Sequence, residues 1–411
     1  MTAFIVEHQC PQCGAPARLQ EADRLIRCPY CRVGSYLTTP GHFRYVLPSR
    51  APENADLIWF PYWRLKGMLF TCTAGGIQER FVDVSYQAIS MAAVPPSLGF
   101  RSQTQKLRFA LPDNCRGAFL RPRMEPRQSL QLALNQFGGP KIRTLHQEYI
   151  GETLSLIYAP FYYKHGLYDA LLNEPLPMTD SETQGDLGRL PAEDARWPLE
   201  FVPTLCPSCG WDLDGSGDSL VLTCPNCQRI WQPRGADLKE VRAAHQTEND
   251  DRTDIYLPFW RIRAQVSGAD LDTYADLVKL ANLPKVIRPG WEKRQFYFWS
   301  PAFKVRPRRF LGLATGMTLA QPEGPWQPRP PRGETYPVNL PPSEAAQTLK
   351  LSVARFLRPR QKLVSLLPGI QVRPRSFVLV YIPFRKGHHE LINDRLKLAL
   401  SKNMLSLAHN L

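Results

Sequence analysis

Two groups of four cysteines with the same spacing constrain this chain more than any other feature. Each group reads C-x2-C-x14-C-x2-C, and the cysteines are Cys10, Cys13, Cys28, Cys31, Cys206, Cys209, Cys224 and Cys227. Two C-x2-C turns joined by a short hairpin can present four thiolates to one tetrahedral ion. We therefore predict two zinc ribbons, at residues 1–40 and 204–235, with one Zn²⁺ in each. A rubredoxin-like iron site uses the same ligands and is the alternative.

Four thiolates complete the coordination of zinc, so neither predicted site has a position left for a substrate or a water molecule. Both ions are accordingly expected to be structural. The other two of the ten cysteines, Cys72 and Cys115, are predicted to be buried thiols and not nucleophiles.

A box of proline and aromatic residues follows each cysteine group. Ile58–Lys66 reads IWFPYWRLK, and Ile255–Arg263 reads IYLPFWRIR. A further box lies around Pro160 in the first half and around Pro383 in the second. The repeated order predicts an internal duplication in which two copies of one fold follow the two ribbons.

The periodicity of apolar residues gives the class of these two copies. Strands are predicted at residues 43–47, 57–73, 79–90 and 153–158, where aromatic and β-branched residues alternate with polar ones. Helices are predicted at residues 126–137, 165–173, 236–246, 343–356 and 396–411, and the proline-rich residues 321–342 are expected to be irregular. The predicted class is α+β, with each ribbon followed by a mainly antiparallel β domain that contains a few helices.

The predicted domains follow from these elements and from composition. They are a ribbon at 1–40, an α+β domain at 41–175, an acidic, proline-rich linker at 176–203, a second ribbon at 204–235 and an α+β domain at 236–411 that ends in a helix.

The chain carries 51 basic and 37 acidic side chains, a net charge of +14, and most of the excess lies in the second half. Such a surface attracts nucleic acid, an anionic membrane surface or an acidic protein, and charge alone does not choose among them.

Arginines that flank prolines are the candidates for contact with anions or nucleic acid. Proline keeps such a segment extended and spaces two guanidinium groups that can bind phosphates or carboxylates. The alternative is a solvated basic surface with no specific ligand. The candidates are Arg306, Arg308, Arg309, Arg358, Arg360, Arg373 and Arg375.

An apolar stripe along the predicted C-terminal helix is the candidate for binding a partner protein. It consists of Leu396, Leu400, Met404 and Leu407. Such a stripe either packs on its own domain or inserts into a groove of the partner.

Signatures of catalysis are missing from the sequence. It has no Walker loop, no dinucleotide-binding glycine fingerprint, no H-E-x-x-H and no G-x-S-x-G. His165 and the pair His388 and His389 follow equivalent boxes, but no matched acid or nucleophile accompanies them. No signal peptide and no membrane-spanning run is recognisable, so we expect a soluble, cytoplasmic, non-enzymatic protein.

The pattern C-P-x-C-G…C-P-x-C followed by Tyr256-Leu-Pro-Phe-Trp260 resembles a set of bacterial zinc-ribbon proteins, here in tandem. That set has no established activity, so the resemblance implies ribbons and boxes but no mechanism. The expected function is a non-enzymatic, zinc-stabilised adaptor or structural subunit of a bacterial cytoplasmic protein assembly. The alternative is a nucleic-acid-binding protein that uses the basic second half.

Overall fold

The computed structural model describes residues 5–99, 105–111, 115–137, 143–176, 190–193, 197–247, 253–359 and 361–406. Within these ranges the chain is a mixture of strands and six helices, with more strand than helix. It divides into two compact units. Unit 1 consists of Met1–Lys66, Val82–Pro140 and Glu152–Pro203, and unit 2 of Gly67–Phe81, Lys141–Gly151 and Thr204–Leu411.

Unit 1 begins with the first cysteine group on two short hairpins. The strands are β1 (Ile5–Gln9), β2 (Pro16–Gln20), β3 (Leu25–Arg27) and β4 (Gly34–Thr38). β1 pairs with β2 and β3 with β4, both antiparallel. The end of the predicted linker is a strand as well, because β14 (Glu200–Pro203) pairs antiparallel with β4.

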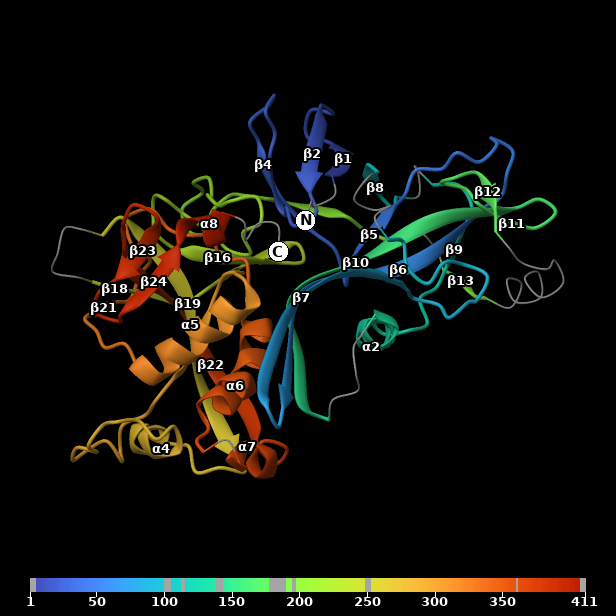
Figure 1. The fold of residues 1–411 in the computed structure, drawn as a ribbon. Helices are drawn as coiled ribbons and strands as arrows, with labels where there is room; N and C mark the ends of the chain where they lie inside the picture. Colours follow the sequence, from blue (N-terminus) through green and yellow to red (C-terminus); the bar gives the residue numbers. More distant parts are fainter. Residues whose placement is uncertain are drawn as a thin grey trace. The chain divides into compact units, whose positions relative to one another are not determined.

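The main sheet of the first half is built around long strands. Its members are β5 (Phe43–Val46), β6 (Leu57–Thr73), β7 (Gly76–Gln87), β8 (Leu107–Phe109), β9 (Ala118–Leu120), β10 (Thr144–Tyr163), β11 (Leu167–Asp169), β12 (Glu174–Pro175) and β13 (Ala192–Glu193). The order is β13-β9-β6-β10-β5-β8-β1-β2, and β7, β6 and β10 run side by side (Figure 1). The predicted helix at 126–137 is confirmed as α2 (Pro126–Phe137).

The core of unit 1 lies on this sheet. In the part of β6 that belongs to unit 1, every residue from Trp59 to Lys66 is buried, so the strand is covered on both faces and does not alternate. Phe60, Tyr62, Ile157 and Phe161 are central members of the core. The aromatic residues of the first boxes are therefore core residues, as the sequence predicted.

Unit 2 contains the second cysteine group on β15 (Leu222–Thr223), β16 (Ile230–Arg234) and β17 (Asp237–Glu240). The predicted helix at 236–246 is wrong. Arg234 pairs with Asp237 across a tight turn that contains Gly235 at φ +58°, and β18 (Ala243–Gln246) then joins a second sheet. The pairing of both segments with neighbouring strands overrides their polar, helix-compatible composition.

The second sheet of unit 2 has the order β20-β19-β22-β18-β21. Its strands are β19 (Ile255–Ser267), β20 (Phe298–Pro301), β21 (Trp326–Gln327) and β22 (Gln371–Lys386), together with β18. Off this path, β23 (Glu390–Asn393) pairs with β22, and β24 (Leu398–Ser401) pairs with β23. The two boxes of this half lie opposite each other, because β19 and β22 are antiparallel and Pro258 faces Tyr381.

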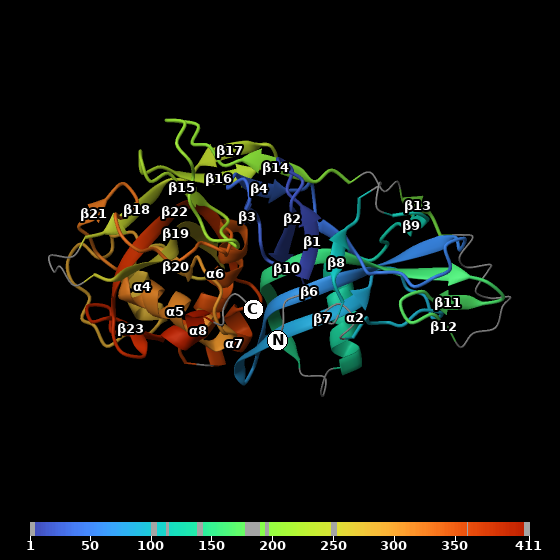
Figure 2. The ribbon, with the colours of Figure 1, turned by 90° about the horizontal axis from the view of Figure 1, so that it is seen from above.

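Two helices pack against this sheet, α5 (Pro307–Ala320) against β20 and α6 (Pro342–Phe356) against β19, β20 and β22 (Figure 2). Further helices in the described part of unit 2 are α4 (Tyr274–Leu280), α7 (Gln361–Leu366) and α8 (Lys402–Ser406). α6 confirms the helix predicted at 343–356. α4 and α5 were not predicted, although a capping box between Thr273 and Asp276 begins the first and Pro307 stands at the start of the second.

Two predicted helices are replaced by hairpins. Residues 165–173 contain β11, which pairs with β10, and residues 398–401 form β24 (Leu398–Ser401), which pairs with β23 (Glu390–Asn393). Only the short α8 follows, so the continuous C-terminal helix is wrong between 396 and 406. Leu400 lies buried in β24, Met404 lies in α8, Leu396 lies between strands, and Leu407 is outside the described residues.

The first box of unit 1 is fixed by a set of backbone bonds. The carbonyl of Pro61 accepts from the Ala88 N–H at 2.9 Å, and the Ala88 carbonyl accepts from Arg123 and Met124, both at 2.9 Å. The indole Nε1 of Trp63 then donates to the Met124 carbonyl at 2.7 Å. A proline has no N–H to offer a sheet, and here only its carbonyl is used.

Unit 2 contains the same set around its own box. The Pro258 carbonyl accepts from the Ala302 N–H at 3.0 Å, and the Ala302 carbonyl accepts from Asn339 and Leu340, both at 3.0 Å. Nε1 of Trp260 donates to the Leu340 carbonyl at 2.9 Å. The parallel pairing of β5 with β10 also corresponds to that of β18 with β22. One neighbour differs, since β9 is parallel to β6 and β20 is antiparallel to β19.

Candidate metal centres and basic surface

The first cysteine group converges on one point. The sulfurs of Cys10 and Cys31 are 3.7 Å apart, as are those of Cys13 and Cys28, and all four lie within 4.8 Å of one another. Zn–S bonds of about 2.3 Å in a tetrahedron place sulfurs roughly 3.8 Å apart, whereas a disulfide is about 2.0 Å long. The spacing therefore fits four free thiols around a single ion.

The second group has the same geometry in unit 2. Cys206 and Cys227 have sulfurs 3.6 Å apart, those of Cys209 and Cys224 are 3.5 Å apart, and all four again lie within 4.8 Å. Each group could thus hold one metal ion, which agrees with the ligands predicted from the spacing.

Tight turns of the backbone direct the sulfurs of each group toward one another. Gly14 and Gly210, each directly after the second cysteine of its group, have φ of +70° and +72°, and their N–H groups donate to the carbonyls of Cys10 and Cys206. Glycine tolerates this left-handed conformation best. At the fourth cysteine of each group the next residue also has positive φ, although it is Arg32 or Gln228, at +62° and +58°. The backbone of both second turns is thus held in a conformation that other residues rarely adopt.

Backbone hydrogen bonds lower the pKa of one thiol in each cysteine group. The backbone N–H of Cys31 lowers the pKa of Cys28 to about 6, and the N–H of Trp211 lowers the pKa of Cys209 to about 6. The thiolate is the form that ligates metal. By contrast, burial raises the pKa of Cys72 to about 12 and that of Cys115 to about 11, so neither is an activated nucleophile.

Exposed apolar side chains flank both clusters. Tyr30 and Val33, beside the second turn of the first group, are 68% and 43% exposed. Leu205 and Trp211, beside the first turn of the second group, are 53% and 57% exposed. We call these two pairs the knuckle pairs. Sequence reasoning missed them, although a large apolar residue next to a C-P-x-C turn was a visible signal.

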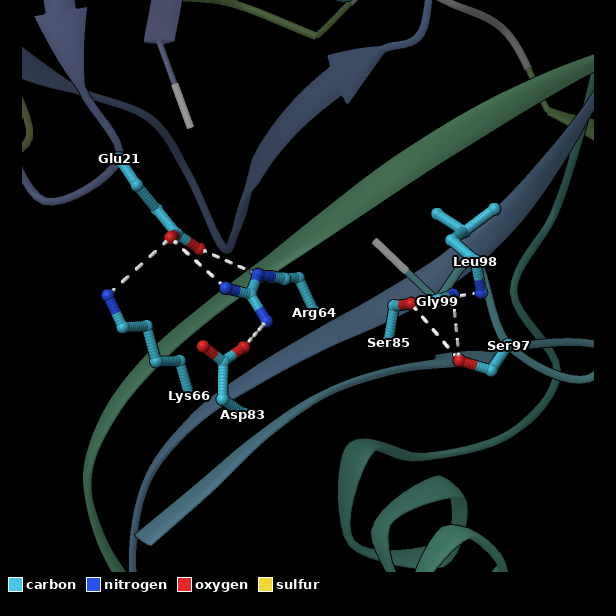
Figure 3. A network of polar contacts seen from close by, with 8 residues as sticks. All are labelled: Glu21, Arg64, Lys66, Asp83, Ser85, Ser97, Leu98 and Gly99. Carbon is cyan, nitrogen blue, oxygen red and sulfur yellow. Dashed lines mark hydrogen bonds and ion pairs between the residues drawn. The ribbon is translucent and has the colours of Figure 1, made fainter. Parts of the chain in front are cut away.

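A buried cluster of charges holds the first ribbon on the main sheet of unit 1 (Figure 3). Nε of Arg64 in β6 lies 3.1 Å from a carboxylate oxygen of Glu21, which follows β2, and the guanidinium also pairs with Asp83 of β7. Nζ of Lys66 is 3.9 Å from the other Glu21 oxygen. The side chains of Glu21, Arg64 and Lys66 are at most 3% exposed, and burial lowers the pKa of Lys66.

The arginine at the same place in the second box has different partners. Arg261, three residues after Pro258 as Arg64 is after Pro61, lies over the rings of Tyr297 and Trp326 at 4.9 and 5.5 Å. The two boxes therefore share their backbone and tryptophan hydrogen bonds but differ in the contacts of this arginine. It forms ion pairs in unit 1 and cation–π contacts in unit 2.

The seven candidate arginines fall into separate places in unit 2. Arg306, Arg308 and Arg309 stand at the start of α5, and Arg358 follows α6. Arg373 and Arg375 are exposed at the start of β22, and Arg360 is outside the described residues. The structure brings Arg308 and Arg358 to one small cavity together with Arg355, which was not among the candidates.

A larger cavity of about 780 Å³ lies in unit 2 beside the second cysteine group. Its lining includes Thr223, Asn226, Arg332, Glu334, Tyr336 and Tyr381. Glu334 is paired with Lys386 at 2.5 Å, and the Tyr336 hydroxyl donates to the Leu405 carbonyl at 2.9 Å. Several of its polar groups are thus engaged in holding the fold.

Fold and clusters together define a class, namely a mixed α/β protein of two compact units that each contain one four-cysteine cluster suited to a metal ion. Comparison with protein-family models, curated protein sequences and solved structures gave no match. Among the helices in the described ranges, none is long and apolar enough to cross a membrane.

Proposed function

We propose that this chain is a non-enzymatic, zinc-stabilised adaptor or structural subunit of a protein assembly in the bacterial cytoplasm. The role is supported by the knuckle pairs: exposed apolar side chains, Tyr30 with Val33 and Leu205 with Trp211, lie beside each cysteine cluster. Exposed aromatic residues on rigid backbone are typical anchors of protein interfaces, since they bury much area and lose little conformational entropy.

Zinc is the metal that we propose for both clusters. Sulfur separations of 3.5 to 3.7 Å match tetrahedral Zn–S bonding, and four cysteines complete the shell. One Zn²⁺ per cluster, two per chain, would rigidify the turns that carry the knuckle pairs. In this role the ions supply stability and do no chemistry.

We also propose that the two halves arose by internal duplication. The support is the repeated set of bonds from Trp63 to Met124 and from Trp260 to Leu340, together with the matching pairings of β5 with β10 and β18 with β22. The different neighbours β9 and β20 would then be changes made after duplication.

The adaptor proposal is tested by recovery of partner proteins. Tagged protein at native expression is purified from nuclease-treated extract of its own organism, as wild type and as the double variant Tyr30→Ser, Trp211→Ser. Proteins bound through the knuckle pairs are expected to be lost from the variant. The matched control is Val286→Ser, because Val286 is 87% exposed and is distant in sequence from both cysteine groups.

Recovery that is unchanged in the double variant, with both metal sites intact, would contradict the proposal. Loss of the same proteins from Val286→Ser would also contradict it, because the effect would then not be specific to the knuckle pairs.

Nucleic-acid binding is the second candidate, and one feature of unit 2 favours it. Arg373 of β22 lies directly opposite Gln265 of β19, the Arg375 guanidinium donates to Gln265, and Arg263 is exposed two residues before it. A two-stranded ribbon that presents three arginines has the size to enter the major groove of duplex DNA.

A further inference from the structure

A small cavity in unit 2 collects guanidinium groups from separate parts of the chain. It has a volume of about 340 Å³ and is lined by Arg308 from the first turn of α5, Arg355 from the last turn of α6, Arg358 just after α6, and Glu79 from β7. Gly76, Ile77, Ala354 and Leu357 complete the lining. Glu79 is the one acidic residue among these lining residues, so two positive charges remain in excess.

The three arginines differ in their ion pairs and hydrogen bonds. Nη1 of Arg355 lies 3.2 Å from a Glu79 carboxylate oxygen, and Nη1 of Arg358 donates to the carbonyls of Arg355 and Leu357 at 3.1 and 2.9 Å. Within the part of the chain that the structure describes, the Arg308 guanidinium has no ion pair or hydrogen bond. Since a guanidinium has five N–H donors, Arg358 also retains donors for a ligand.

We propose that this cavity binds a phosphate group, either as free phosphate or as the terminal group of a small phosphate monoester. Such a group carries a charge of about −1.5 to −2 near neutral pH, which the excess of two guanidinium charges balances. One planar guanidinium group can also donate two parallel hydrogen bonds to two oxygens of the same phosphate, which an ammonium group does not do.

The charge around α5 supports the same ligand. Its first turn holds Arg308 and Arg309 after Arg306 at the cap, with no acidic residue and no side-chain cap. Cations are unfavourable at the positive end of a helix dipole, so this cluster of arginines costs free energy in the absence of an anion. A phosphate in the cavity would offset that cost.

The apolar part of the lining allows the two candidate ligands, free phosphate and a phosphate monoester, to be distinguished. Ile77, Ala354 and Leu357 can contact an organic group attached to the phosphate but gain nothing from inorganic phosphate. A site for a monoester should therefore bind phenyl phosphate more tightly than inorganic phosphate, and a site for free phosphate should not.

The test is calorimetric titration of the full chain with inorganic phosphate and with phenyl phosphate at one fixed ionic strength. The variant Arg308→Gln is compared with Arg309→Gln, which removes the same charge from the adjacent residue that does not line the cavity. We expect at least a tenfold rise in Kd for Arg308→Gln and a change of less than about twofold for Arg309→Gln. Glu79→Gln should lower Kd, because it removes the carboxylate that competes for Arg355.

Both arginines are exposed, so neither substitution should unfold the protein, and unchanged circular dichroism and melting temperature verify this. If neither compound binds at concentrations up to roughly 10 mM, the proposal is overturned. Equal losses in Arg308→Gln and Arg309→Gln would overturn it as well, because the binding would then reflect general positive charge.

Discussion

The indole Nε1 of Trp63 donates a hydrogen bond of 2.7 Å to the backbone carbonyl of Met124, 61 residues later in the chain. Trp260 makes the corresponding bond to Leu340 at 2.9 Å, 80 residues later. In both units the bond joins the strand of the first box to the segment before a helix, α2 or α6. Each tryptophan therefore ties the strand of its box to the segment that precedes a helix, at the corresponding place in its unit.

Replacement of either tryptophan should destabilise its own unit by a similar amount. Trp63→Phe and Trp260→Phe each remove the donor and leave a buried carbonyl without it, at a cost of about 1–3 kcal/mol plus the cost of a smaller ring. Chemical denaturation of each variant measures this loss. A variant as stable as the wild type would argue against equivalent roles.

The buried charge cluster of unit 1 predicts a larger effect. Arg64→Met leaves Glu21 and Asp83 buried without their main cation, which should cost about 3–5 kcal/mol. Arg18→Met, an exposed arginine on β2 of the same ribbon, is the control and should change stability by less than about 0.5 kcal/mol. Equal denaturation midpoints for Arg64→Met and Arg18→Met would refute this account of how the ribbon is held.

Unit 1 should also lose stability in mild acid. Burial lowers the pKa of His8, which is stacked on Phe201 at 5.2 Å between ring centroids. The unfolded chain then binds more protons than the folded one as the pH falls through about 6.5, so the contribution of His8 is full above that pH and declines below it. Melting temperatures of wild type and His8→Gln between pH 7.5 and 5 test this. The difference between them should shrink toward acid.

Salt dependence separates the two candidate functions. Binding of duplex DNA through six to eight phosphate contacts requires a log–log slope of roughly −5 to −7 against salt concentration. We expect the adaptor outcome, which is weak binding near 150 mM salt that does not depend on DNA sequence. Charge reversal of Arg263, Arg373 and Arg375 should leave partner recovery unchanged. Submicromolar, sequence-dependent binding that these reversals abolish would instead favour the nucleic-acid function.

The sequence predicted correctly those elements that depend on interactions between residues close together in the chain. The apolar spacing at 126–137 gives α2 with its bounds, and the run at 57–73 gives β6. The cysteine ligands were also predictable, because two C-x2-C turns bring their sulfurs together without help from the rest of the fold.

Elements that depend on distant pairing were predicted wrongly. Residues 236–246 and 396–401 have compositions that suit a helix, yet β17, β18 and β24 form because partner strands are available to them. The cavity around Arg308 was equally hidden, since Glu79 and Arg355 are 276 residues apart in sequence. Contacts between residues so far apart in sequence produce no periodic pattern that could be recognised in one sequence.

We propose that both cysteine clusters are structural zinc sites, and the metal content of the purified protein decides this. Structural zinc supplies on the order of 10 kcal/mol of apparent folding free energy, so the ions should survive purification under reducing conditions. Elemental analysis of freshly purified protein should find two zinc ions per chain, and Cys13→Ser or Cys209→Ser should each remove one and unfold the affected ribbon. Fewer than two zinc ions in the wild type, or iron in place of zinc, would contradict the account.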